Sequence, residues 1–143
     1  MNKMVAQRLP VLTLAVLLPL VWAAGAAADP IGKNDKEVQA AANPILDNLL
    51  AGFNAGDYAK YSKDFDATSK EMMPEEKFQN VRTDLLKRIG KYQSRQYLGF
   101  LRQDKATTAL WKGKFSSTES DILIKMEVSK RKDKNVVVGL WFQ

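Results

Sequence analysis

Two tyrosines and two aspartates lie close together in the middle of the chain: Tyr58, Tyr61, Asp64 and Asp66. A carboxylate can act as a general base, and a phenol can donate a hydrogen bond to a developing oxyanion. An isomerase or a dehydratase uses these two groups together. The cluster therefore supports the hypothesis of a small lyase- or isomerase-type enzyme with a Tyr/Asp pocket.

A structural interpretation of the same segment competes with the catalytic one. Asp57 can cap a short helix, while Tyr58 and Phe65 hold neighbouring helices together. Asp64 and Asp66 would then be solvated acids. Because helix capping, packing and solvation explain this segment without any chemistry, we favour this interpretation and assign no catalytic residue.

The composition excludes several kinds of site. The chain has 143 residues with no Cys and no His. Disulfide frameworks, zinc fingers and nucleophiles activated by histidine are therefore ruled out. The acidic residues are scattered along the chain, so we expect neither a metal ion nor a cofactor.

The aromatic residues suggest a binding site. Small-molecule sites are largely apolar and carry a few polar tips. Our candidates for the walls of such a site, and for contact with a small apolar ligand, are Tyr58, Tyr61, Trp111 and Met126. The alternative is that these side chains simply fill the core of a small domain.

Residues 1–28 have the composition of a secretory signal peptide. Lys3 gives a positive start, an apolar run follows, and small residues end at Ala28. The run of about 14 residues is shorter than the roughly 20 that span a bilayer. We therefore expect cleavage between Ala28 and Asp29, a periplasmic or secreted protein, and no stable membrane anchor, rather than an uncleaved anchor helix.

The charge is unevenly distributed along the chain. The formal net charge is +6, and basic residues concentrate in the second half. The densest run is Lys130-Arg131-Lys132 with Lys134. An acidic partner or anionic surface could bind there, but we favour a solvated hairpin loop. Nucleic acid is not expected as a partner, because no aromatic residues are interleaved with this run.

Hydrophobic periodicity predicts three helices in the first half of the chain. The first covers residues 36–54, and Pro44 either kinks it or starts it anew. A short second helix begins after Asp57. A third begins at Pro74, a favourable residue in a first turn, and ends at Gly90, because glycine commonly stops helices.

Beyond Gly90 the pattern changes to that of strands. Segments 95–102, 105–115, 120–128 and 136–142 are rich in apolar residues, and the middle two alternate with charged ones. We therefore predict one domain over residues 29–143 of the α+β class. Three N-terminal helices would pack on a curved four-stranded antiparallel sheet.

Several short stretches are similar to those of a known superfamily. They are Asn54-Ala55-Gly56-Asp57-Tyr58, Asp64-Phe65-Asp66, Met73-Pro74-Glu75-Glu76-Lys77-Phe78, Ile89-Gly90-Lys91-Tyr92 and Gly139-Leu140-Trp141-Phe142. With them, the chain resembles an uncharacterised secreted branch of the nuclear transport factor 2-like, or cystatin-like, superfamily. This branch is a domain of unknown function sometimes joined to α/β-hydrolases. The resemblance covers residues from about 36 to the end and implies a cystatin-like cone.

The same resemblance bears on chemistry and on assembly. Enzymes of the superfamily share a conical pocket with an Asp–His pair or a Tyr–Asp group, and only the second is open to a chain without histidine. Relatives often pair through the open face of the sheet. On that face the alternation places Leu110, Leu123, Val137 and Trp141, which suggests a homodimer through Leu110, Leu123 and Trp141.

Taken together, the sequence favours an exported, non-catalytic module that binds a small ligand or a protein partner. The Tyr/Asp enzyme is the alternative.

Overall fold

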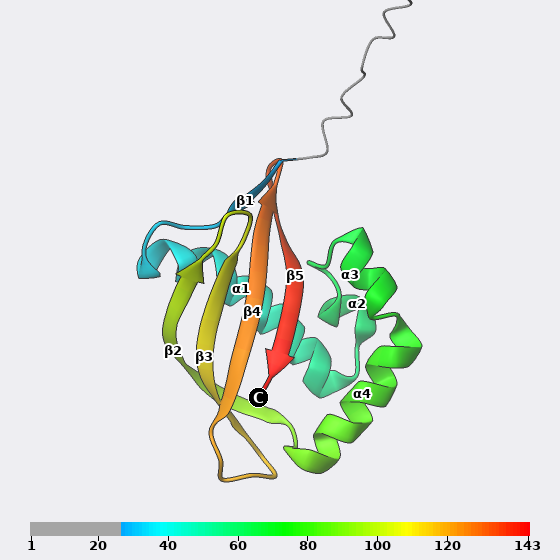
Figure 1. The fold of residues 1–143 in the computed structure, drawn as a ribbon. Helices are drawn as coiled ribbons and strands as arrows, with labels where there is room; N and C mark the ends of the chain where they lie inside the picture. The colour runs from blue at the N-terminus through cyan, green and yellow to red at the C-terminus, as the bar shows by residue number, and fades with distance from the viewer. Residues whose placement is uncertain (1–26) are drawn as a thin grey trace, which may run out of the picture.

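The computed structural model describes residues 27–143 and has four helices and five strands in that range. Apart from one short strand, the helices precede the strands (Figure 1). The elements in chain order are β1 (Ala28–Pro30), α1 (Asp35–Ala55), α2 (Tyr58–Tyr61), α3 (Ala67–Met72), α4 (Glu75–Arg88), β2 (Tyr92–Arg102), β3 (Thr107–Phe115), β4 (Ile122–Arg131) and β5 (Lys134–Phe142). The predicted α+β class is confirmed.

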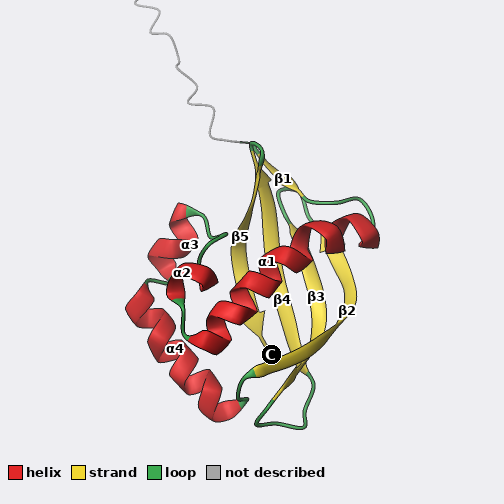
Figure 2. Ribbon diagram, turned by 180° about the vertical axis from the view of Figure 1, so that it is seen from behind, coloured by secondary structure: helices red, strands yellow, loops and turns green. Residues whose placement is uncertain are grey.

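The sheet is antiparallel and strongly curled. Strands β2, β3, β4 and β5 pair in chain order, so β2 and β5 form its two edges. The short β1 pairs with β4 over Ser129 to Arg131, just beyond Val128, where β3 stops pairing with β4. Helix α1 crosses the concave face of the sheet, and α2, α3 and α4 lie beside β5 (Figure 2).

Helix α1 is one continuous helix. The Asn34 side chain caps it by accepting a 3.0 Å hydrogen bond from the N–H of Glu37. Gly56 ends it in the left-handed conformation, with φ +71°. The helix runs through Pro44, which is exposed, so the proline does not begin a new helix.

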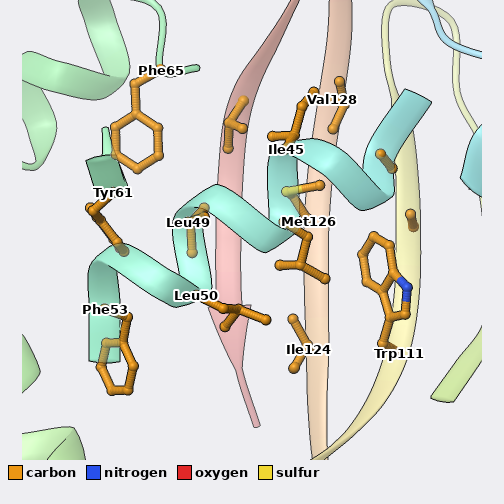
Figure 3. Close-up of a cluster of buried hydrophobic side chains, with 14 of the residues drawn as sticks. Ile45, Leu49, Leu50, Phe53, Tyr61, Phe65, Trp111, Ile124, Met126 and Val128 are labelled. Carbon is orange, nitrogen blue, oxygen red and sulfur yellow. The ribbon is translucent and has the colours of Figure 1, made fainter. Parts of the chain in front are cut away.

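The core lies between α1 and the concave face of the sheet (Figure 3). The buried side chains of α1 include Ile45, Leu49, Leu50 and Phe53, and those of the sheet include Trp111, Ile124, Met126 and Val128. Burying one such side chain stabilises a fold by about 1.5–3 kcal/mol. Packing of α1 on the sheet is therefore the main source of stability.

Two elements differ from the prediction. Helix α3 has no buried residue, so it leaves no apolar periodicity in the sequence. Strand β1 is only three residues long and joins the sheet through its backbone. The predicted boundaries of the other elements hold to within a few residues.

Most of the predicted signal peptide lies outside the described residues. Only its last two residues are described, and Ala28, the last before the proposed junction, is the first residue of β1. Within residues 27–143, no helix is both long and apolar enough to cross a membrane.

Candidate functional site

A groove of about 210 Å³ lies between β5 and the helices α2, α3 and α4. We call it the β5 groove. Its lining is mostly apolar, and Lys77 is the one charged residue among the described residues that form it. The lining residues are Tyr61, Phe65, Ser69, Met72, Met73, Lys77, Val137, Val138, Gly139, Leu140 and Trp141.

The position of α2 depends on Gly52 of α1. A Cβ atom at Gly52 would lie 2.4 Å from the backbone N of Tyr61 and 2.7 Å from its Cα. No side chain fits in that space, so α2 packs directly against the backbone of α1. Asp57 starts α2 by accepting a 3.0 Å hydrogen bond from the N–H of Lys60. The close contact places Tyr61 in the wall of the groove.

Aromatic packing holds this wall in place. The ring centroid of Tyr61 lies 4.3 Å from that of Phe78 on α4 and 5.3 Å from that of Phe65. The ring centroid of Tyr58 lies 5.7 Å from that of Phe78. Aromatic pairs at these separations stabilise a structure by about 0.5–1.5 kcal/mol beyond area burial. The groove wall is thus built on a preformed cluster.

The segment between α2 and α3 and the first turn of α3 are both bonded to one residue at the edge of β5, Val137. The N–H of Val137 donates a 2.7 Å hydrogen bond to the C=O of Asp64. The hydroxyl of Ser69 donates a 3.0 Å bond to the C=O of Val137. Phe65 and Val137 consequently form an isolated parallel bridge. These bonds fix the end of the groove at Val137.

The carboxylate of Asp66 organises the start of α3. It accepts a 2.6 Å hydrogen bond from the N–H of Ser69 and pairs with the guanidinium of Arg131 at 2.5 Å. Its side chain is only 8 % exposed, so the expectation of a solvated acid is wrong. Burial by itself raises the pKa of Asp66, but the bonds from Ser69 and the charge of Arg131 outweigh it. The pKa therefore lies below the ordinary value of 3.8.

This lowered pKa makes the stability of the fold depend on pH. The contribution of Asp66 is complete above its unfolded-state pKa and is lost as the pH falls through the folded-state value. Asp66→Ala is expected to cost about 1–2 kcal/mol at neutral pH, and less well below pH 3.8. Asp66→Asn keeps a capping oxygen and should cost less. Urea unfolding at both pH values checks this, and a loss of equal size at both would contradict it.

The two tyrosine hydroxyls of the sequence hypothesis have different environments. Tyr58 donates a 2.8 Å hydrogen bond to the C=O of Met73, so its single proton is already used. Burial, with the nearby Tyr58 as a smaller cause, raises the pKa of Tyr61 to about 12. Tyr61 therefore stays neutral at physiological pH. It can donate a hydrogen bond but cannot act as a base.

The four candidate ligand-binding residues do not line one cavity. Tyr61 lines the β5 groove, whereas Tyr58 is outside the lining and packs against Phe78. Met126 is completely buried under α1, and Trp111 is 1 % exposed. Trp111 donates a 3.2 Å bond from Nε1 to Oδ1 of Asn43 and borders a separate open depression between α1 and β2.

Sequence reasoning missed several groove residues. Met72 is 67 % exposed, and Met73 follows it immediately before Pro74. Paired methionines next to a helix start were a usable signal, because flexible thioether side chains are common on adaptable binding surfaces. Ser69 and Lys77 gave no such signal.

The groove is suited to binding rather than to acid–base chemistry. Its described lining contains no carboxylate, and its titratable groups are the Tyr61 phenol and the Lys77 ammonium. Asp64 contributes its backbone C=O, and Asp66 its cap and ion pair, to the surrounding structure. Among residues 27–143, acidic side chains do not gather in a group that could hold a metal ion.

Comparison with known proteins gives one match. A family described as "Protein of unknown function (DUF3887)" matches residues 47–138, which include the C-terminal part of α1, all of α2 to β4 and the first half of β5. The chain belongs to this family. DUF3887 thus includes most of the residues that form the β5 groove. No curated protein and no solved structure matches the chain.

Proposed function

We propose that this DUF3887 protein is an exported, non-catalytic module that binds a small apolar ligand or an apolar segment of a protein partner in the β5 groove. The observation that carries the proposal is the lining itself. Apolar side chains of two methionines and three aromatic residues meet there around a single cation. Such a surface recognises its ligand by burial of apolar area.

Lys77 gives the ligand an electrostatic preference. Its Nζ donates a 3.0 Å hydrogen bond to the C=O of Met72, which holds the ammonium beside the groove. An ammonium has three N–H groups, so two are left for a ligand. An apolar ligand with a carboxylate would satisfy both the lining and the charge. Decanoate is a simple probe of this class.

A pair of variants tests the proposal. Met72→Glu puts a negative charge on an exposed side chain that lines the groove, so it should weaken decanoate binding roughly tenfold or more. Val81→Glu, on an exposed position of α4 outside the groove lining, is the matched control and should bind as the wild type does. Isothermal titration calorimetry measures both. Equal decanoate affinities of the two variants would show that decanoate binds outside the β5 groove.

The proposal of export rests on the composition of residues 1–28. The proposals of cleavage after Ala28 and of a periplasmic or secreted location rest on the same composition. Kinship with the nuclear transport factor 2-like superfamily is likewise a proposal. The curled antiparallel sheet around α1 supports it, as do the stretches of similar sequence.

The Tyr/Asp enzyme has weaker support. Its phenol and carboxylate would have to meet in one cavity. Tyr58 and Asp66 already form bonds within the protein, and neither lines the groove.

A homodimer through the open sheet face is a second proposal about partners. Leu110 and Leu123 are half-buried there, and Trp141 is 41 % exposed. The placement of Val137 on this face is wrong: the register shift between Glu127 and Val128 puts it opposite the buried Val128, and it is 1 % exposed. The exposed Leu98 and Leu101 of β2 extend the same apolar surface. Large exposed apolar side chains gathered on one face usually mark a contact.

Sedimentation equilibrium tests the dimer. We expect the wild type to dimerise and Leu123→Lys to give a folded monomer. A two-fold interface contains each substitution twice, so one lysine should suffice. A wild type that stays monomeric at high concentration would rule out this interface.

A further inference from the structure

The outer edge of β5 has free backbone groups beside the groove. Leu123 and Gln143 exchange both of their backbone hydrogen bonds. In an antiparallel pair, hydrogen-bonded residues alternate with residues whose N–H and C=O point to the opposite side. By this register, the backbone groups of Leu140 and Phe142 point away from β4. Within residues 27–143, no backbone bond from outside the strand ladders and no side-chain bond involves them.

The same edge already accepts a strand at its other end. The register shift between Glu127 and Val128 leaves Val138 as a bulge, and Val137 beyond it also points outward. There the chain near Phe65 pairs with Val137 in parallel. The pairing stops after this one residue, because the chain turns away into α3. The edge from Val138 to Phe142 is left without a neighbouring strand.

The sequence of this free edge does not protect it against pairing. Exposed edge strands normally carry charged residues or proline, or are covered by another element. From Val136 to Phe142, β5 has neither a charged residue nor a proline. The bulge of β5 lies at Val138, next to Val137, which is already paired with the chain near Phe65. The residues after the bulge keep a regular register with β4. Such an edge is suited to an added strand.

We propose that the β5 groove binds an extended peptide segment that adds a strand to the edge of β5 at Leu140 and Phe142, with an apolar side chain in the groove and a carboxylate beside Lys77. This inference rests on the proposed function and narrows its ligand to a peptide. Backbone hydrogen bonds supply affinity in this mode of binding, and the groove supplies side-chain preference. The charge of Lys77 selects a segment that ends in, or carries, a carboxylate.

The test uses a short peptide of alternating threonine and valine that ends in leucine with a free carboxylate. Leu140→Pro removes one outward N–H, which an edge strand tolerates on its free side. Leu140→Ala is the matched control, because it shortens the same side chain and keeps the N–H. A second peptide, methylated on alternate backbone nitrogens, removes donors without changing the protein.

We expect the peptide to slow hydrogen exchange at the amides of Leu140 and Phe142 by about tenfold or more. Leu140→Pro should bind the peptide roughly fivefold more weakly than Leu140→Ala does. The two variants should bind decanoate with the same affinity as each other. The methylated peptide should bind weakly to the wild type.

Three outcomes would overturn the inference. If decanoate binds and the peptide does not, or binds without protecting Leu140 and Phe142, strand addition fails and the proposed function stands. If neither probe binds, the proposed function fails as well. Protection of Leu140 that rises with protein concentration alone would show that a second copy of the chain occupies the edge.

Discussion

Gly52→Ala is expected to destabilise the protein by about 3 kcal/mol, the upper end of the range of about 1–3 kcal/mol that is typical when a packed site is overfilled. The added Cβ would lie 2.4 Å from the N of Tyr61 and 2.8 Å from the C=O oxygen of Asp57. Both contacts are with backbone atoms, which cannot rotate away as a side chain can. Helix α2 would have to move as a whole, and Tyr61 with it.

The sign of this effect distinguishes packing from helix propensity. In an open helix, replacing glycine with alanine stabilises by about 1 kcal/mol. Ala40→Gly, on an exposed position of the same helix, is the control and should cost about that amount. Urea unfolding measures both variants. A Gly52→Ala protein as stable as the wild type would mean that α2 does not pack against the backbone of α1.

Phe65→Ala should cost about 3–5 kcal/mol, as for other buried phenylalanines. Phe65 is 8 % exposed, and its ring packs edge-on against Tyr61. Its backbone also forms the bridge to Val137. Removal of the ring therefore opens a cavity where the helices meet the edge of β5, and the groove loses part of its wall.

Two other variants serve as controls for the loss of stability in Phe65→Ala. Met72→Ala removes another groove side chain, but one that is 67 % exposed, so its cost should stay within about 0.5 kcal/mol. Asp66→Asn should also cost much less than Phe65→Ala, because the amide still caps α3. Equal losses from Phe65→Ala and Asp66→Asn would show that the ion pair, and not the ring, holds this region together.

The fold class could be predicted because its main elements bury one face. Helix α1 places an apolar residue every three or four positions, and β3 and β4 alternate, so each period is visible in the sequence. The first sheet strand was predicted to begin at residue 95 but begins at Tyr92. Register shifts between Tyr92 and Ser94 and between Tyr97 and Gly99 interrupt its alternation, which hides the beginning of the strand.

The candidate site was harder to predict than the fold. Trp111 and Met126 are apolar residues on the inward face of strands, and a sequence does not show whether such a face meets a cavity or a helix. Here α1 covers them. The groove instead forms where β5 ends the sheet and α3 stands apart from it. That geometry depends on the bridge at Val137, a contact between backbones that leaves no side-chain pattern.

The central claim is that the β5 groove is where this protein binds its ligand. Methyl NMR of the wild-type protein titrated with decanoate tests it most directly, because Met72 and Met73 line the groove and Met126 lies in the closed core. We predict saturable shifts of the Met72 and Met73 methyl signals, with Met126 unchanged. Unchanged Met72 and Met73 signals at saturating decanoate, or shifts confined to the depression at Tyr97 and Trp111, would contradict the claim.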